Sequence, residues 1–355
     1  MLVVIYIYLL DYSLFCGWQF SDGSLHALMV GDPQLEGHAR TQREPYLPDN
    51  FSNGYNDYYV RFVVGSLFRR LRPNMVVVLG DILSSQWIGD DEFWWRVERY
   101  RWIFQEVISS GVLLVNVTGN HDIGYGGEME EHMVKRFEEA FGPVNRNYPL
   151  AGHTFSNLNS LNLDSSLNEV LQGKSRAHLV SMTELEDPVI LLTHLPMHKP
   201  PGCCSDSPHI QHNWRGHVEY QNFLSENETK FILENVCPYL IFTGHDHVGC
   251  DYLHALPVNS KRKDVFLENG RSVEGVSEHT VRSVMGEYSG NVGLFEIRKK
   301  SSGGYEYAFS NCSFVKLQYL SVLFITTLVW ICIGLLISIF KLCLRCIKKQ
   351  KQKIP

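Results

Sequence analysis

Five short, mainly apolar segments, each followed directly by polar side chains, constrain the fold of this chain more than any other feature. In four of the five, a glycine immediately precedes the polar residue. Apolar runs of this length are typical of buried strands, and helical patterns separate the first three, so the order predicts a layered α/β fold. In such folds, ligands bind beyond the carboxyl ends of the strands. The segments cover residues 25–30, 75–79, 112–117, 188–193 and 239–243.

The other elements are predicted from periodicity and composition. Apolar residues at helical spacing predict helices over residues 58–70, 92–108, 128–141 and 222–235. Further strands are predicted over residues 273–284, 292–297 and 305–309. Polar and turn-forming residues predict loops over 40–57 and 200–216, and a mixture of short strands and loops over 143–187.

The composition is that of a folded protein. Of the 355 residues, 45% are hydrophobic and 12% aromatic, which is enough for the core of one large domain or two medium ones. The net charge of −6 argues against a general nucleic-acid binder, so we expect no nucleic-acid partner. Nine cysteines are too few for a disulfide scaffold. In an oxidising lumen, some cysteines before the predicted membrane segment would form disulfides, and buried free thiols are the alternative. These cysteines are Cys203, Cys204, Cys237, Cys250 and Cys312.

A membrane anchor is predicted near the carboxyl terminus. Residues 319–340 are 22 positions without a charge, long and apolar enough for a transmembrane helix. Residues 341–355 follow with six positive charges and no acid. Because basic residues stay on the cytosolic side, we expect the domain over residues 25–313 to be lumenal or extracellular. A buried core helix is the alternative, and the basic tail argues against it. Cys343 and Cys346 lie where palmitoylation occurs.

The amino-terminal segment and the glycosylation sequons also point to a secretory route. Residues 1–20 are mostly apolar but contain Asp11, and they predict a signal peptide, a signal anchor or a truncated version of either. A buried strand is the soluble alternative. Asn116 lies in a predicted core strand, so we expect it to be unmodified. The sequons occur at Asn50, Asn116, Asn227 and Asn311.

The polar residues that follow the five segments carry metal-binding side chains. One such group is weak evidence, because Gly-Asn and His-Asp pairs are also common in turns. Five groups in one chain are strong evidence for a metal site. Carboxylate, amide and imidazole ligands together suit Mn²⁺, Zn²⁺ or Fe²⁺, and one carboxylate can bridge two ions in a two-metal hydrolase. The residues are Asp32, Asp81, Asn120, His121, His194, His245 and His247.

These motifs, read in order, resemble a known family. The phrases GDPQLEG, GDILSSQWI, GNHD and GHDHVGCDY, with a histidine after residues 188–193, resemble the calcineurin-like metallophosphoesterase superfamily over residues 25–309. The resemblance implies a four-layer αββα sandwich. Joined to a carboxyl-terminal membrane helix, the phrases are most similar to the eukaryotic membrane-bound branch. That branch includes enzymes that remodel GPI anchors by removing ethanolamine phosphate from a mannose of the glycan.

The resemblance also implies a ligand set for two divalent cations, of which Mn²⁺ is expected before Zn²⁺ or Fe²⁺. Asp32 and His247 would hold the first ion, and Asp81 would bridge both. The second would be completed by Asn120, His194 and His245.

Three further residues acquire expectations in the same way. His121 would act as the general acid that protonates the leaving alkoxide in an in-line displacement at phosphorus, and Asp122 would orient it. The family usually has a histidine two residues after the first aspartate, where this chain has Gln34. Gln34 is therefore a further candidate ligand, weaker than imidazole, which favours Mn²⁺ over Zn²⁺.

The function implied by the resemblance is a phosphodiesterase that removes ethanolamine phosphate from GPI lipid or GPI-anchored proteins, aiding their transport from the endoplasmic reticulum to the Golgi. Lys351 and Lys353 resemble a dilysine retrieval signal, so we expect contact with coat proteins and residence in the endoplasmic reticulum, its exit sites or the Golgi. The alternative for the tail is an ordinary basic segment beside the membrane that only fixes the orientation of the helix. The alternatives for function are hydrolysis of another lipid or nucleotide phosphoester, or a non-catalytic membrane cargo receptor with the same fold.

Overall fold

The computed structural model describes Tyr12, Cys16 and residues 24–43, 51–262, 265–301 and 303–351. The chain divides into two compact units, Met1–Phe314 and Val315–Pro355, which are described separately. Most of the predicted targeting segment, the sequon at Asn50 and Lys353 of the predicted retrieval signal lie outside the described residues.

The first unit is built on two large sheets. The first sheet has the strand order β12-β11-β15-β14-β1-β2-β3, and β1, β2 and β3 run parallel to one another. Its strands are β1 (Leu25–Val30), β2 (Met75–Leu79), β3 (Leu113–Val117), β11 (Phe266–Glu268), β12 (Arg271–Val273), β14 (Val292–Lys299) and β15 (Tyr305–Cys312).

The second sheet has the order β10-β13-β9-β6-β5-β4, and its four central strands are parallel. Its strands are β4 (Arg146–Leu150), β5 (His153–Leu158), β6 (Val189–Thr193), β9 (Leu240–Thr243), β10 (Cys250–His254) and β13 (Val276–Thr280). A separate hairpin pairs β7 (Ile210–His212) with β8 (Val218–Gln221).

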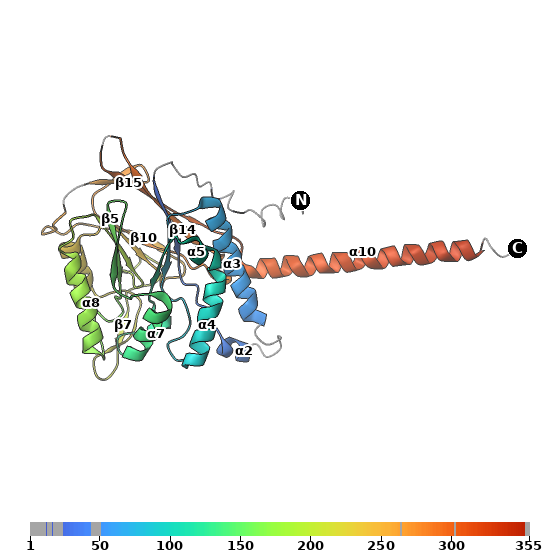
Figure 1. The fold of residues 1–355 in the computed structure, drawn as a ribbon, viewed down its shortest axis with the longest axis horizontal. Coiled ribbons are helices and arrows are strands. Elements are labelled where there is room, and N and C mark those ends of the chain that lie inside the picture. Colours follow the sequence, from blue (N-terminus) through green and yellow to red (C-terminus); the bar gives the residue numbers. More distant parts are fainter. Residues whose placement is uncertain are drawn as a thin grey trace. The chain divides into compact units, whose positions relative to one another are not determined.

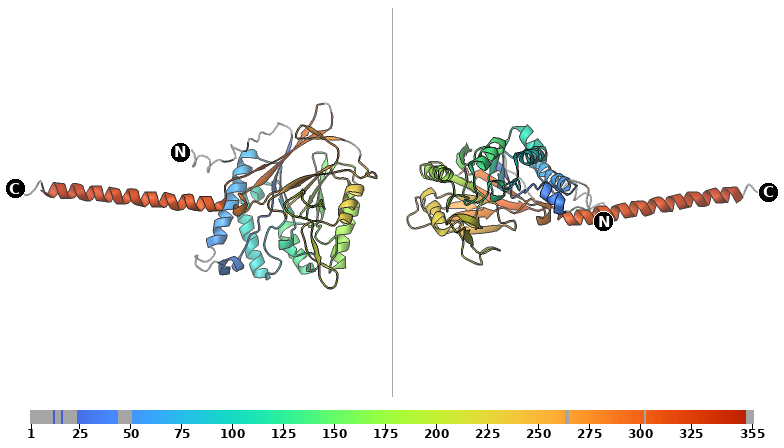
Figure 2. Two further views of the ribbon diagram at one scale, coloured as in Figure 1. Left: turned by 180° about the vertical axis from the view of Figure 1, so that it is seen from behind. Right: turned by 90° about the horizontal axis from the view of Figure 1, so that it is seen from below.

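The hydrophobic core lies between the two sheets. Successive side chains of a strand point to opposite faces, so Ala27 and Met29 of β1 join the core cluster, together with Phe155 and Phe242 of the second sheet. Helices cover the outer faces, with α3, α4 and α5 on one side and α8 on the other (Figure 1; Figure 2). The predicted four-layer αββα sandwich is therefore confirmed. These helices are α3 (Phe51–Leu71), α4 (Asp90–Ile103), α5 (Gln105–Ser110) and α8 (Glu169–Met182).

Shorter helices complete the first unit. They are α2 (His38–Arg43), α6 (Asn120–Ile123), α7 (Glu131–Phe141) and α9 (Glu226–Phe231), with a π-helical turn at Ile232–Val236 and a 3-10 turn at Gly286–Tyr288. Asn116, whose sequon we expect to be unmodified, is buried in β3 and accepts a hydrogen bond from the Tyr100 hydroxyl at 2.5 Å.

Tertiary contacts override local preference in one predicted loop and one predicted helix. The loop prediction for residues 40–57 is wrong at both ends, because α2 extends to Arg43 and α3 begins at Phe51. The polar residues that suggested a loop have partners there, since Asp57 accepts two hydrogen bonds from Arg99 at 2.6 and 2.7 Å. The helix predicted over 92–108 is divided at Phe104, where Arg61 donates to the carbonyl of Trp102.

The segment 143–187 contains a helix that its sequence did not predict. Helix α8 begins after Asn168, whose side chain accepts a hydrogen bond from the Leu171 amide at 3.1 Å. Arg176 then pairs with Glu228 at 2.6 and 2.7 Å, which ties the helix to α9. The helix predicted over 222–235 begins only at Glu226. Three short strands, β10, β11 and β12, were also not resolved as separate elements by the sequence pattern.

Two disulfides join distant parts of the first unit. Cys204 pairs with Cys250, one of the pairings that the sequence left open, whereas Cys237 is buried as a free thiol. Cys16 pairs with Cys312, which the sequence did not suggest. Tyr12 lies close by, is buried, and donates a hydrogen bond from its hydroxyl to the Val63 carbonyl at 3.0 Å.

The second unit is one long helix, α10 (Leu317–Lys351). Over Leu317–Arg345 it is long and apolar enough to cross a membrane, with a mean hydropathy of 2.7 over an 18-residue stretch. It contains the whole span predicted from residues 319–340. The predicted palmitoylation at Cys343 and Cys346 stays a prediction.

A buried histidine predicts how stability depends on pH. Burial alone would lower the pKa of His279, but Asp251 and Glu268, which contact its ring at 2.7 and 2.6 Å, raise it to about 9. Because this lies above the ordinary value of 6.5, the stabilising contribution is complete below pH 6.5 and is lost as the pH rises through 9. We expect a loss of about 2 kcal/mol, discounted because Asp251 is largely exposed.

Urea unfolding of the full chain in detergent, followed by tryptophan fluorescence at several pH values, measures this loss. His279→Gln should be less stable at pH 6.5 and should lack the decline, whereas His212→Gln, at an exposed position, should behave as wild type. The same pH dependence in His279→Gln and wild type would contradict the assignment.

Candidate metal centre

The predicted metal ligands gather where the two sheets present the carboxyl ends of their parallel strands. Asp32, Asp81 and Asn120 follow β1, β2 and β3 of the first sheet. On the second sheet, His194 follows β6, and His245 and His247 follow β9. Each sheet therefore supplies half of the group, as expected for a site at the ends of parallel strands.

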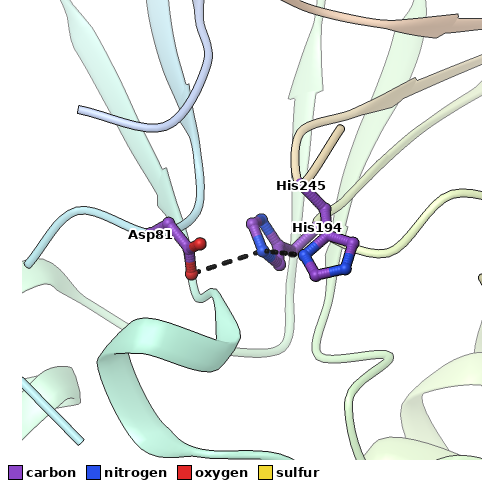
Figure 3. A group of neighbouring side chains, drawn as sticks. All are labelled: Asp81, His194 and His245. Carbon is purple, nitrogen blue, oxygen red and sulfur yellow. Dashed lines mark hydrogen bonds and ion pairs between the residues drawn. The ribbon is translucent and has the colours of Figure 1, made fainter. Parts of the chain in front are cut away.

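Four of the predicted ligands converge on one point. The Nε2 atom of His194 lies 3.0 Å from Oδ1 of Asn120, 3.2 Å from Nδ1 of His245 and 3.3 Å from Oδ1 of Asp81. Figure 3 shows Asp81, His194 and His245 pointing toward one another. Nδ1 of His194 is 2.8 Å from the Leu79 carbonyl, and as the donor it leaves the Nε2 lone pair free for a cation.

The remaining predicted ligands lie on the other side of Asp81. Ligand atoms of Asp32, Asp81 and His247 all lie within 4.8 Å of one another. The side-chain amide of Gln34 is between two of them, with Nε2 at 3.1 Å from Oδ2 of Asp81 and 3.2 Å from Nε2 of His247. Turning this amide by half a rotation would present its oxygen to the same place. The two oxygens of Asp81 thus face two different groups of donors.

The electrostatics of the group fit bound cations. Asp32 and Asp81 are almost fully buried, and Oδ2 of Asp32 has no hydrogen-bond partner among the described residues. Burial raises the pKa of Asp32 well above its usual value, and the neighbouring Asp81 carboxylate raises it further. Burial lowers the pKa of His245 to about 3, which keeps this imidazole neutral. At His194 burial is outweighed by the Asp81 carboxylate, which raises the pKa of this ring to about 9, so a cation bound there would take the place of the ring proton beside the buried carboxylates.

The backbone around the site is forced into uncommon conformations. Asp32, Gln34, Asp81 and His245 have positive φ angles of 44°, 40°, 48° and 71°, which non-glycine residues rarely adopt. The glycines before the polar groups are needed for close packing. A Cβ atom on Gly119 would collide with Asp81. The Gly-polar pattern in the sequence therefore reflects the packing of the strand ends against one another.

The contacts of Asp122 correct one prediction. Its carboxylate accepts hydrogen bonds from the backbone amides of Leu83 at 2.8 Å, Gly119 at 2.9 Å and Ile82 at 3.2 Å. The partner of the His121 ring is Gln86, whose Nε2 lies 3.1 Å from Nδ1 of His121.

Asp122 therefore holds the backbone of two loops, and Gln86 orients the ring. The sequence contained Gln86 in the GDILSSQWI phrase, but a contact between separate loops has no local signal.

A cavity of about 180 Å³ opens from the metal centre. Its walls include Gln34, His121 and four of the predicted ligands, Asp81, Asn120, His245 and His247. Residues that the sequence did not single out form the rest: Tyr125, Asp206, Tyr220, Asn222, Phe223 and Asp246. The ring of His209, in the predicted loop over residues 200–216, lies 5.8 Å from the ring of Tyr220 between centroids. The loop thus contributes to the cavity through Asp206.

Comparison with known proteins identifies the class. The family model for calcineurin-like phosphoesterases matches residues 26–249, which is more than half of the chain. The chain therefore belongs to the calcineurin-like phosphoesterase family and is a metal-dependent phosphoesterase. The family uses a dinuclear metal site, and the Asp and His clusters described above can bind metals.

Individual proteins of known sequence or structure are also similar to this chain. The chain is similar to Protein TED1 of Saccharomyces cerevisiae, with 29% identity over 83% of this chain and 79% of TED1. It is also similar to Metallophosphoesterase 1 of Ailuropoda melanoleuca, with 28% identity over 66% of this chain and 64% of that protein. Among solved structures, a dimetal phosphatase from Danio rerio aligns at 13% identity with a TM-score of 0.40, covering 82% of this chain and 99% of its own.

Replacing the residue between the two donor groups tests the centre. We expect Asp81→Ala to lose both metal ions, because its two oxygens face both groups of predicted ligands. Asp91→Ala, an exposed carboxylate in the first turn of α4, serves as the control and should keep them. Elemental analysis of the purified proteins counts the ions, and two ions per chain in Asp81→Ala would contradict the bridging position.

The corrected roles of Gln86 and Asp122 give opposite expectations. Gln86→Leu should lower turnover about ten- to a hundredfold with unchanged metal content and stability, because it removes the partner of the His121 ring. Asp122→Asn should mainly destabilise the fold, by about 1–3 kcal/mol, since buried backbone amides lose their charged acceptor. Steady-state kinetics and urea unfolding of both variants separate the two effects. A normal turnover in Gln86→Leu would show that His121 needs no such partner.

Proposed function

We propose that this chain is a dinuclear phosphodiesterase that removes ethanolamine phosphate from a mannose of the GPI-anchor glycan. The convergence of the donor atoms of Asp81, Asn120, His194 and His245 carries the catalytic part of the proposal. The substrate is supported by the motifs of the membrane-bound branch and by similarity to TED1 over most of both chains. The apolar helix over Leu317–Arg345 supports the proposal that the protein is anchored in a membrane and acts on a lipid-linked substrate.

Two divalent cations, for which Mn²⁺ is our candidate because Gln34 replaces the usual histidine, would supply Lewis-acid stabilisation of the phosphoryl group and an activated water. Asp32, Gln34 and His247 would hold one of them, and Asn120, His194 and His245 the other, with Asp81 between. This distribution is supported by Oδ2 of Asp32, which has no hydrogen-bond partner among the described residues, and by Nε2 of His194, which faces the predicted ligands of the second ion.

The residues of the chain divide the remaining tasks. The His121 ring lines the cavity beside the metal centre and can give a proton to the leaving alkoxide of the sugar. Gln86 fixes the orientation of this ring. The His121 amide donates to Oδ1 of Asp81 at 2.8 Å, so the position of the acid is tied to the donor groups.

The cellular setting completes the proposal. The positive charges of residues 341–355 support a cytosolic tail and a lumenal catalytic domain. Lys351 and Lys353 support retrieval by coat proteins and residence in the early secretory pathway. GPI lipid or GPI-anchored proteins are then the substrates, and their export would depend on this reaction.

The role of His121 is tested by substitution. We expect His121→Ala to keep its metal ions and to lose turnover of an aryl phosphodiester by about a hundred- to ten-thousandfold, the usual contribution of a general acid. His212→Ala, at an exposed position in β7, is the matched control. Loss of metal in His121→Ala in step with activity would argue that the residue supports the centre and does not act as the acid.

The substrate is tested in cells that lack the protein. Mass spectrometry of GPI glycans should show ethanolamine phosphate retained on mannose, and wild-type chain should remove it, whereas Asp81→Ala should not. An unchanged glycan profile in the knockout would remove GPI from the proposal and leave the phosphoesterase activity.

A further inference from the structure

The cavity beside the metal centre has an unusual balance of charge. Among the described residues that line it there is no lysine or arginine, although phosphate sites commonly use these cations. Two carboxylates, Asp206 and Asp246, lie on its wall outside the metal centre. A substrate with several negative charges beyond the reacting phosphate would meet no cationic side chain here. The wall instead suits a phosphoester that carries a positive charge close to phosphorus.

Asp206 is the carboxylate available for such a charge. Both oxygens of Asp246 already accept hydrogen bonds, from the Val248 amide at 3.0 Å and from the Ser205 hydroxyl at 3.2 Å. The Asp206 carboxylate accepts none from the described part of the chain, and the residue is exposed at the rim of the cavity.

The position of Asp206 is fixed on both sides. On one side, Cys204 forms the disulfide with Cys250, and Ser205 bonds to Asp246. On the other side, the Asn222 side chain donates to the Ser207 carbonyl at 2.8 Å and accepts from the His209 amide at 2.7 Å. The rim loop, residues 204–209, is therefore held at both ends, and the carboxylate between them faces the same cavity as the metal donors.

Two tyrosines connect the metal centre to this rim. The ring of Tyr125 is 6.4 Å from the ring of His245 and 5.7 Å from the ring of Tyr220, measured between centroids. Tyr125 lines the cavity and is only 8% exposed, yet its hydroxyl has no hydrogen-bond partner among the described residues. Because the hydroxyl oxygen is not fully enclosed by protein atoms, it opens to the cavity, where a ligand can supply the missing hydrogen-bond partner.

From these contacts we propose that the cavity is a subsite for a primary ammonium group that a short carbon chain links to the reacting phosphate. Asp206 and the face of the Tyr220 ring bind the ammonium group. The Tyr125 hydroxyl donates a hydrogen bond to a phosphoryl oxygen. Carboxylates and aromatic faces both attract ammonium ions. The inference rests on the proposed function and states which part of its substrate is recognised. That part is the aminoethyl ester, which stays bonded to phosphorus in the product phosphoethanolamine.

Binding of the product fragment tests the subsite without turnover. Isothermal titration of the metal-loaded chain should show phosphoethanolamine binding about tenfold more tightly than propyl phosphate, in which a methyl group replaces the ammonium. Asp206→Asn should abolish this difference, and the variant should fold because the side chain is exposed. Asp187→Asn, at an exposed carboxylate that does not line the cavity, should keep it. Equal affinity of wild type for the two ligands would overturn the subsite.

Turnover separates this inference from the proposed function. Two p-nitrophenyl phosphodiesters, one aminoethyl and one propyl, release nitrophenolate when water forms the new bond to phosphorus. We expect kcat/KM to favour the aminoethyl ester about tenfold, and Asp206→Asn to lower only that value. Tyr125→Phe should lower kcat/KM for both esters, because the phosphoryl group is common to them.

Hydrolysis of both esters at equal kcat/KM would keep the phosphodiesterase and overturn the subsite. Preferential binding of phosphoethanolamine without hydrolysis of either ester would keep the subsite and overturn the enzymatic proposal. An equal loss for both esters in Asp206→Asn would mean that the residue only supports the fold of the rim, and would also overturn the subsite.

Discussion

The burial of two carboxylates side by side, Asp32 and Asp81, is the constraint on which the rest of this structure depends. Removing an ionised carboxylate from water costs several kcal/mol, and a second negative charge beside it adds to that cost. The surrounding structure offers only partial compensation. Oδ1 of Asp32 accepts the His245 amide and Oδ1 of Asp81 accepts the His121 amide, but Oδ2 of Asp32 has no partner among the described residues. Divalent cations held by these clusters would supply the missing positive charge.

The sandwich architecture follows the same requirement. The carboxylates and the amide ligand stand on the first sheet, whereas the histidines stand on the second. Neither sheet can assemble the donor set alone, so the packing of Met29, Phe155 and Phe242 between the sheets also sets the geometry of the centre. Two sheets packed face to face form a dense and rigid core. Such a core keeps the metal-donor atoms at fixed distances from one another.

The parts of the site that the sequence predicted are those with a local signature. A strand, a glycine and a polar residue occupy consecutive positions, so Asp81 and His245 could be recognised without knowing their neighbours. The partner of the His121 ring could not be recognised from the sequence, because Gln86 and Asp122 both carry suitable side chains. Only the geometry of the loops decides between them. The same holds for the fold, where α3 begins early because Asp57 finds Arg99 across the structure.

The disulfide between Cys204 and Cys250 would divide the maturation of the site into two stages. The predicted metal donors follow the ends of paired strands, and none of them is a cysteine. The rim loop that carries Asp206 is held on one side by this covalent bond. A chain that folds under reducing conditions would thus keep its capacity to bind metal but present a loosened rim, so that selectivity for a substrate, and not the reactive centre itself, would be gained only in an oxidising compartment.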